Sequence, residues 1–281
     1  MVVFAHISHN RRTISVVQVF SHVASFHIAS IKPNIPGINL MSTSPANSSA
    51  EIMLDEVRQR KQELRKEIRA SMKRLSSNEV ARQSQLIWDQ FFELPQYQEA
   101  NSVGLFVSMP SGEVQTDYAL KRVIHDSKTL YVPRVGLNFE MCDMELVRCE
   151  IDGAHDFYGQ DETLYKSWPR NKWGIPEPPS PFIDVAKRGE IDLLVVPGIA
   201  FDGEGQRLGQ GKGYYDRFIS TIQHGEGEAK KPLLVAVALT PQYIGQEENA
   251  EKYKRAVPVL DHDIKMDIVI PPFRTILCQK V

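Results

Sequence analysis

The chain has 281 residues, of which 42% are apolar and 24% are charged, and its 33 basic residues nearly balance 35 acidic ones. This length allows one large domain or two small ones with a sizeable core, and the charge balance gives no indication of a nucleic-acid or anionic-membrane partner. Three cysteines without metal-ligand spacing, and no apolar run near the roughly 20 residues that a membrane-spanning helix needs, predict a soluble protein of a reducing compartment.

The first fifty residues differ in composition from the rest. They contain nine Ser and four His but no Asp or Glu. Their three basic residues are Arg11, Arg12 and Lys32. An acid-free, Ser-rich leader with early arginines is typical of a mitochondrial transit peptide. Secretion, suggested by the apolar stretch 14–20, and a dispensable extension before a true start at Met41 are the alternatives. In each case we expect residues 1–50 to be a disordered leader and residues 51–281 to form the domain.

Hydrophobic periodicity predicts helices that alternate with strands. Residues 51–75 carry apolar side chains on one face of an amphipathic helix, namely Leu54, Val57, Leu64, Ile68 and Leu75. Further helices are predicted at 78–95, 116–125 and 214–223. Strands are predicted at 102–108, 130–133, 144–148, 191–200, 233–239 and 267–270. Residues 152–190 are predicted to be a loop. This alternation predicts an α/β fold, a single three-layer αβα domain with a mostly parallel central sheet.

A glycine-rich segment at 207–216 lies between a predicted buried strand and a predicted helix. Three alternating glycines can bring backbone N–H groups close to a phosphate, and the following helix N-terminus adds a favourable dipole. Arg207 and Lys212 would supply positive charge. The segment is not a Walker A loop, because Gln210 replaces its second glycine and Gly213 follows the lysine. A tight turn is the structural alternative, but the cations, the tyrosine pair and the acid nearby favour a phosphate site.

The string R-L-G-x-G-K-G-Y-Y-D at 207–216, preceded by P-G-x-x-F-D at 197–202, resembles the signature of the 5-formyltetrahydrofolate cyclo-ligase (5,10-methenyltetrahydrofolate synthetase) family. Other segments resemble the family in the same order, namely K-x-x-L-R at 61–65, F-x-S-M…E-x-x-T at 106–116, I-P-x-P at 175–178 and V-P…D-x-x-x-D at 257–267. The resemblance covers residues 51–272. One departure is that three residues separate Met109 from Glu113, where the family usually has two.

The resemblance implies a reaction and a role for each matched residue. The reaction is the ATP-dependent conversion of 5-formyltetrahydrofolate to 5,10-methenyltetrahydrofolate, with Mg²⁺ as a cofactor. Residues implied to bind ATP are Lys61, Arg65, Arg207, Leu208, Gly209, Gln210, Gly211, Lys212, Gly213, Tyr214 and Tyr215. Those implied to act in catalysis are Arg207, Lys212 and Tyr214. Those implied to bind folate are Val107, Glu113, Trp173 and Tyr214. The implied Mg²⁺ ligands are Asp216 and Asp263.

Each role has a structural alternative. Taken alone, Lys61 and Arg65 would lie on a solvated helix face, Asp263 would lie in a loop turn and Trp173 would serve packing. At the level of function, the alternatives are a folate-binding protein without turnover and a sugar-phosphate isomerase or CoA transferase with a similar α/β architecture. We expect a monomer that acts on the small molecule 5-formyltetrahydrofolate, without nucleic-acid or membrane partners. We expect it in the cytoplasm, or in mitochondria if residues 1–50 act as a transit peptide.

Overall fold

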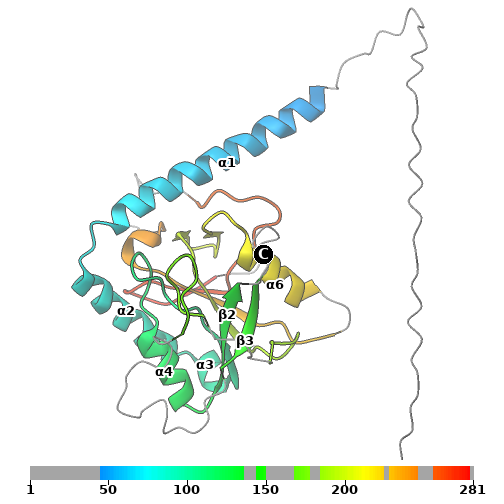
Figure 1. Ribbon diagram of the computed structural model, residues 1–281. Coiled ribbons are helices and arrows are strands. Elements are labelled where there is room, and N and C mark those ends of the chain that lie inside the picture. Colours follow the sequence, from blue (N-terminus) through cyan, green and yellow to red (C-terminus); the bar gives the residue numbers. More distant parts are fainter. Residues whose placement is uncertain are drawn as a thin grey trace, which may run out of the picture. The chain divides into compact units, whose positions relative to one another are not determined.

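Seven strands form a mixed sheet at the centre of the structure (Figure 1). In their order across the sheet they are Met144–Arg148 (β3), Thr129–Val135 (β2), Ser102–Gly104 (β1), Leu193–Val196 (β4), Leu233–Val237 (β7), Ile268–Ile270 (β8) and Ile276–Leu277 (β9). The five inner strands pair in parallel, and β3 and β9 pair antiparallel at the two edges. This computed structural model describes residues 45–135, 144–149, 168–177, 184–224, 228–245 and 256–278.

Helices cover both faces of this sheet. They are Pro45–Met72 (α1), Ser77–Phe92 (α2), Pro95–Glu99 (α3), Asp117–His125 (α4) and Tyr214–His224 (α6). Leu193 and Val195 of β4 belong to a core cluster shared with α1 to α4, whereas Leu194 and Val196 belong to a second cluster shared with α6. Because adjacent strand residues point to opposite faces, α6 lies on the other side of the sheet from α1 to α4. The predicted three-layer αβα fold with a mostly parallel sheet is confirmed.

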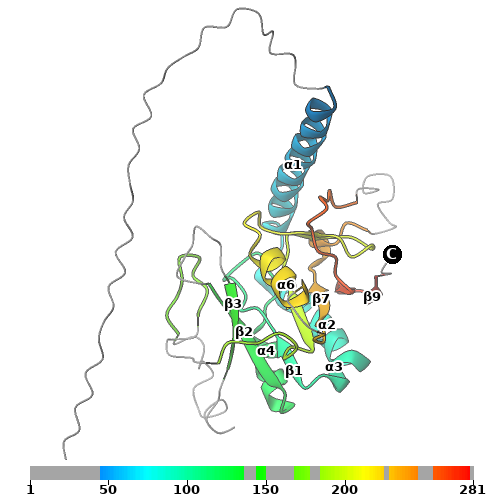
Figure 2. The ribbon, with the colours of Figure 1, turned by 90° about the vertical axis from the view of Figure 1, so that its right-hand side faces the viewer.

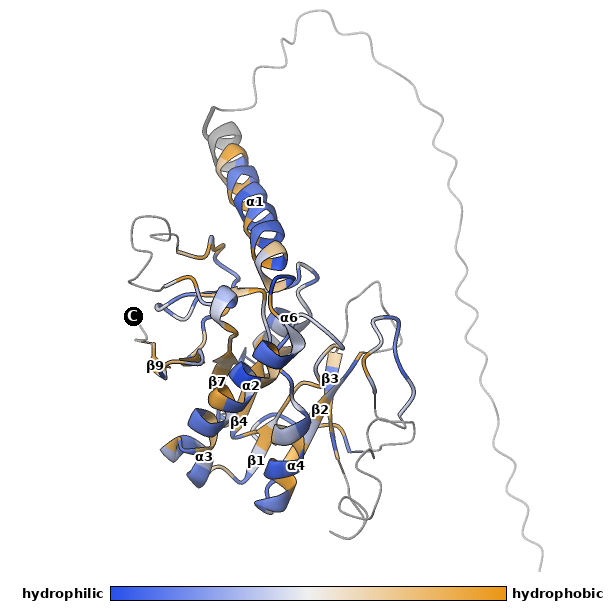
Figure 3. Cartoon of the chain, turned by 90° about the vertical axis from the view of Figure 1, so that its left-hand side faces the viewer, coloured by the Kyte–Doolittle hydropathy of each residue, from blue (hydrophilic) through white to orange (hydrophobic). Residues whose placement is uncertain are grey.

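The long helix α1 is only partly packed. Leu64, Ile68 and Met72 in its second half are buried in the core, whereas Leu54 is 42% exposed. Figures 2 and 3 show the first turns of α1 extending beyond the sheet. The apolar face predicted from the sequence is therefore buried only where other described elements cover it. The helix begins at Pro45, before the first acidic residue, and ends three residues before Leu75.

Among the helices of the described ranges, none has the length and hydrophobicity that a membrane span requires.

Several predicted elements are shorter than expected. The helix predicted at 78–95 is interrupted at Phe92, and α3 begins at Pro95, whose missing N–H is tolerated at a helix start but not in a helix interior. The strand predicted at 191–200 ends at Val196. The chain then forms a small hairpin from Ala200–Phe201 (β5) and Arg207–Leu208 (β6), which places Arg207 before the glycine-rich loop. A short 3₁₀ helix, Thr240–Gln242 (η2), follows β7.

The strand order creates a crevice between β1 and β4. After β1, the next strand of the chain is β2, which lies on the side of β1 that faces away from β4. After β4, the next strands of the sheet are β7 and β8, which lie on the other side. Such a switch point leaves an opening at the carboxyl ends of the two strands, where α/β proteins bind ligands. Gly104 of β1 leaves room for the side chain of Leu194, because a Cβ atom there would lie 2.7 Å from Cδ1 of that leucine.

Candidate active site

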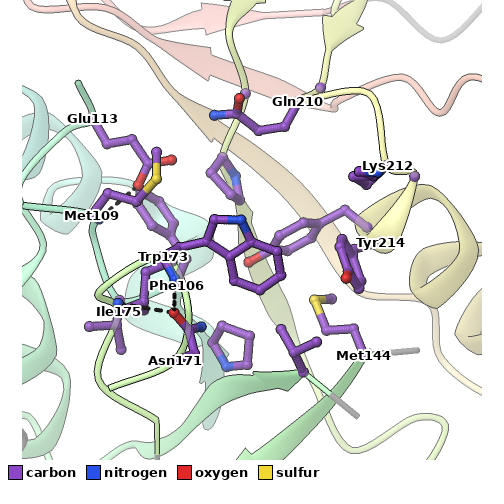
Figure 4. A pocket seen from close by; sticks show the side chains of 18 of the residues that line it. Phe106, Met109, Glu113, Met144, Asn171, Trp173, Ile175, Gln210, Lys212 and Tyr214 are labelled. Carbon is purple, nitrogen blue, oxygen red and sulfur yellow. Dashed lines mark hydrogen bonds between the residues drawn. The ribbon is translucent and has the colours of Figure 1, made fainter. Parts of the chain in front are cut away.

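A cavity of about 370 Å³ lies at the carboxyl ends of β1 and β4. Its walls come from segments far apart in the sequence: residues 106–113 after β1, the turn 171–177, the ends of β2 and β3, and the glycine-rich loop that leads into α6 (Figure 4). The predicted site residues that line it are Val107, Glu113, Trp173, Arg207, Gly209, Gln210, Lys212, Gly213, Tyr214, Tyr215 and Asp216. The fold therefore brings most of the predicted nucleotide and folate residues to one cavity.

The glycine-rich loop is held from outside by α1. Gly211 and Gly213 have φ angles of +101° and +72°, a backbone conformation that favours glycine. Arg65 Nε donates a hydrogen bond to the backbone oxygen of Gly209 at 2.9 Å, and Arg69 Nη2 donates to Oε1 of Gln210 at 2.8 Å. Two guanidinium groups from one helix thus fix the loop at neighbouring positions.

Arg207 is buried beside this loop. Its side chain is 4% exposed, and its guanidinium donates to the backbone oxygen of Pro197 at 3.1 Å and to Oδ1 of Asp216 at 2.5 Å. Its Nε has no hydrogen-bond partner within the described chain. A buried arginine held by a carboxylate presents its remaining N–H groups in a fixed geometry, which suits a phosphate oxygen.

Lys61 and Asp263 form a nearly buried ion pair behind the loop. Oδ2 of Asp263 also accepts a hydrogen bond from the backbone N–H of Leu260 at 2.6 Å. Lys61 is therefore not on a solvated helix face. Neither residue lines the cavity, and the same is true of Arg65, Gly211 and the buried Leu208. The pKa of Arg65 is lowered mainly by desolvation and further by the charge of Arg69, which shows positive charge gathered at this end of α1.

The two predicted metal ligands lie in different surroundings. Asp216 lines the cavity and holds Arg207, whereas Asp263 holds Lys61 outside the cavity lining. Across the described ranges, no three His, Cys, Asp or Glu side chains are grouped as a metal site. Mg²⁺ commonly takes one or two carboxylates and completes its shell with water and substrate phosphates. Asp216 could serve as the carboxylate ligand of an ion that enters the cavity with a phosphate. The assignments of Asp216 and Asp263 as Mg²⁺ ligands both stay predictions.

Aromatic side chains and a carboxyl group also line the cavity. The rings of Trp173 and Tyr214 meet edge to face, with centroids 6.0 Å apart and an interplanar angle of 86°. Glu113 accepts a hydrogen bond from the backbone N–H of Met109 at 3.0 Å (Figure 4). Desolvation raises the pKa of Glu113 to about 7 despite this bond. Glu113 reaches the cavity although an extra residue precedes it, and Val107 lies buried in the same wall.

Sequence reasoning missed several residues that line the cavity. They are Arg69, Phe106, Met109, Pro133, Val135, Met144, Asn171, Ile175, Glu177, Pro197 and Gly198. Arg69 could have been predicted, because it follows Lys61 and Arg65 at the same spacing of four residues and shares their helix face. Asn171 and Glu177 lie in an irregular turn without periodicity, and the I-P-x-P segment at 175–178 marked this turn without giving either side chain a role.

Comparison with known proteins agrees with this arrangement. A profile of the 5-formyltetrahydrofolate cyclo-ligase family matches residues 57–272. A probable 5-formyltetrahydrofolate cyclo-ligase of Caenorhabditis elegans is 30% identical over 80% of this chain and 98% of its own length. The 5-formyltetrahydrofolate cyclo-ligase of Mus musculus is 31% identical over 75% of this chain and 92% of its own. The solved structure of 5,10-methenyltetrahydrofolate synthetase from Aquifex aeolicus matches with a TM-score of 0.58 and 26% identity, over 79% of this chain and 94% of that one.

Proposed function

The chain belongs to the 5-formyltetrahydrofolate cyclo-ligase family, and we propose that the cavity at the carboxyl ends of β1 and β4 is where it performs the family's reaction. The protein is an ATP-dependent ligase that closes 5-formyltetrahydrofolate to 5,10-methenyltetrahydrofolate. One observation carries the location: a cationic glycine-rich loop and an aromatic wall with a carboxyl group line the same cavity. Family membership favours this activity over the isomerase, transferase and storage alternatives.

The chemistry requires activation of a poor leaving group. The formyl oxygen attacks the γ-phosphorus of ATP, the bond to the β-phosphate oxygen breaks and ADP leaves. The N10 nitrogen then attacks the formyl carbon, and phosphate departs with the former formyl oxygen as the ring closes and N10 loses its proton. The protein's task is to align the two substrates and to neutralise the charge that moves between them.

In the phosphate half of the site, Lys212 and Arg207 would contact the phosphoryl oxygens, and both are the proposed catalytic cations. The backbone N–H groups of the loop 209–213 would bind further phosphate oxygens, since glycines allow a close approach. Arg65 supports this role indirectly, because it holds the carbonyl of Gly209. The ion pair between Arg207 and Asp216 also supports the role of Arg207 in phosphate binding. A cation that is already fixed in place needs little rearrangement during the reaction.

In the folate half, the faces of Trp173 and Tyr214 would contact the pterin ring, and the Glu113 carboxylate would accept hydrogen bonds from its N–H groups. The edge-to-face contact between the two rings supports their assignment to the same half of the cavity, the half that would bind folate. Tyr214 is the first residue of α6 and directly follows the glycine-rich loop. It is therefore the residue best placed to lie between the two substrates.

For Mg²⁺, we propose that the ion arrives with ATP and that Asp216 is the cavity's carboxylate ligand. Bound there, Mg²⁺ would neutralise charge on the phosphates. Asp263 would act on the nucleotide end of the site through Lys61, to which it is bonded.

The activity is tested by following the absorbance of the methenyl product with purified full-length protein. We expect product from 5-formyltetrahydrofolate with ATP and Mg²⁺, in a one-to-one ratio with ADP, and none when ATP is replaced by a non-hydrolysable analogue. Equal product formation without a hydrolysable nucleotide would overturn the assignment. A reaction that needs ATP but remains at full rate after Lys212→Ala would instead overturn the proposed phosphate site.

Cellular location and oligomeric state are further proposals. We propose a monomer in the cytoplasm, with mitochondria as the location if residues 1–50 act as a transit peptide. Residues 1–44 lie outside the described ranges, so their sequence alone supports this alternative. Microscopy of fluorescently tagged full-length protein, compared with a chain that begins at Met41, distinguishes the two compartments, and analytical ultracentrifugation measures the oligomeric state.

A further inference from the structure

The turn 171–177 carries Trp173, and its conformation depends on the side chain of Asn171. Oδ1 of Asn171 accepts hydrogen bonds from the backbone N–H groups of Trp173 at 2.9 Å and Ile175 at 3.1 Å, as Figure 4 shows. The backbone of Asn171 closes the same turn, because its N–H donates to the oxygen of Ile175 and its oxygen accepts from the N–H of Gly174, both at 2.9 Å. Gly174 has a φ angle of +77°, which permits the tight reversal.

A second side chain connects this turn to the sheet. Asn171 Nδ2 donates to Oε1 of Glu177 at 2.9 Å, and the same oxygen accepts from the backbone N–H of Val135 at 3.2 Å. Val135 is the last residue of β2 and itself lines the cavity. The chain of bonds therefore runs from β2 through Glu177 and Asn171 to the backbone of Trp173.

Packing holds the ring of Trp173 only in part, because the residue is 37% exposed. Nζ of Lys172 lies 4.5 Å from the centroid of the ring, and the ring lies edge to face against Tyr214, which follows the glycine-rich loop. The position of the ring therefore also depends on the backbone that carries it. A rotation of the turn would move the indole away from Tyr214 and open the aromatic wall.

We infer that Asn171 and Glu177 are positioning residues for the folate half of the active site, which act by holding Trp173 against Tyr214. This inference rests on the proposed function of the cavity. The pair affects the KM for 5-formyltetrahydrofolate far more than the KM for ATP, because none of its hydrogen bonds reaches the glycine-rich loop and it connects to that loop only through the contact of Trp173 with Tyr214.

A double-mutant cycle tests this inference. We expect Asn171→Ala to raise the folate KM about tenfold, the effect of losing the two neutral hydrogen bonds by which its side chain holds the backbone of the turn. Because Asn171 acts through Trp173, the double variant Asn171→Ala/Trp173→Ala should bind folate no worse than Trp173→Ala alone. Additive effects would mean that Asn171 contacts the substrate directly, and an unchanged folate KM in Asn171→Ala would overturn the inference.

Exchanged and control variants separate positioning from a general structural effect. Asn171→Asp places two carboxylates in contact and should raise the folate KM. Adding Glu177→Gln removes one of the two charges and should bring the KM only part of the way back towards the wild-type value, because one amide atom cannot both donate to the carboxylate introduced at position 171 and accept from the N–H of Val135. Arg170→Ala is the matched control, since Arg170 donates to Gly174 in the same turn at 2.7 Å but does not line the cavity. An equal rise in folate KM after Arg170→Ala would mean that any loosening of the turn weakens folate binding. That result would overturn the specific positioning role of Asn171 and Glu177.

Amide hydrogen exchange makes the test independent of turnover. In protein without ligand, the N–H groups of Trp173 and Ile175 should exchange faster in Asn171→Ala and regain protection in Asn171→Asp/Glu177→Gln. Unchanged exchange rates would overturn the placement of Trp173 by Asn171. Absence of turnover in the wild-type protein would count against the proposed function alone, whereas turnover with an unchanged folate KM would count against this inference alone.

Discussion

Glu113 is the side chain through which we expect pH to affect substrate binding. Desolvation in the cavity wall raises its pKa to about 7, and the single N–H of Met109 only partly offsets that shift. The carboxyl group is therefore protonated below about pH 7 in the free enzyme and ionised above it. An ionised carboxylate accepts hydrogen bonds at both oxygens, whereas a protonated one loses part of this capacity.

This protonation predicts a pH-dependent folate KM. As pH rises through about 7, the KM for 5-formyltetrahydrofolate should fall, because ionised Glu113 binds the pterin N–H groups better. In Glu113→Gln the KM should be high and independent of pH in this range. Steady-state rates from about pH 5.5 to 8.5, corrected for reaction without enzyme, measure the effect. The same inflection in the Gln variant would assign it to another group.

Asp216 carries two interactions at once, the ion pair with Arg207 and the proposed contact with Mg²⁺. Asp216→Asn keeps the shape but removes the charge, so kcat should fall by about two orders of magnitude, as for the loss of one charge-stabilising group. The Mg²⁺ concentration needed for half-maximal rate should rise at the same time. Circular dichroism should show an intact fold, although the free energy of unfolding should fall because the buried Arg207 loses its charged partner. Full activity at limiting Mg²⁺ would make Asp216 a structural partner of Arg207.

At the scale of elements, the Lys61–Asp263 ion pair joins α1 to the loop that precedes β8. Removing one partner of a nearly buried pair leaves an uncompensated charge, so Lys61→Met should lower the free energy of unfolding by about 3 kcal/mol. Asp263→Asn in the same protein should restore much of that loss, because no buried charge then remains. Urea unfolding curves measure both values.

An exposed ion pair on the same helix provides the control. Nη1 of Arg58 lies 2.9 Å from Oδ1 of Asp55, and the two side chains are 63% and 74% exposed, respectively. Arg58→Ala should therefore change the unfolding free energy by less than about 1 kcal/mol. If Lys61→Met has an equally small effect, α1 is held by apolar packing of Leu64, Ile68 and Met72 and not by the ion pair.

At the scale of the whole molecule, the position of α1 determines how much of the N-terminus the enzyme needs. The helix begins at Pro45, so a chain that starts at Met41 retains all of it. We expect that chain to melt within a few degrees of the full-length protein and to keep full turnover. The expected reason is that a leader which buries little apolar area against the domain cannot offset an ordering entropy of about 1–2 kcal/mol per residue.

A second truncation provides the contrast. A chain that starts at Ser71 loses Lys61, Arg65 and Arg69 together, and with them the two hydrogen bonds from α1 to the glycine-rich loop. ATP-dependent turnover should be abolished in that chain. Aggregation or loss of activity in the chain that starts at Met41 would show that the leader contributes to the domain.

The sequence by itself determined the family, the layers and most element positions. Continuous apolar runs identified β4 and β7 because both faces of a central strand are buried. The glycine-rich segment predicted an irregular loop before a helix, and Gly211 and Gly213 have positive φ angles that favour glycine. Phosphate binding by this loop stays a prediction. These are local properties, and each can be seen within a short stretch of sequence.

Only the tertiary structure decided which side chains meet. Lys61 pairs with Asp263, 202 residues away, and Val135 bonds to Glu177 across 42 residues. The strand order, the half-buried face of α1 and the turn that positions Trp173 likewise depend on neighbours from distant segments. Periodicity reports whether a residue is buried but not what buries it. The contacts that shape the candidate active site can therefore be seen only in the tertiary structure, where the carboxyl ends of the parallel strands lie at one edge of the sheet.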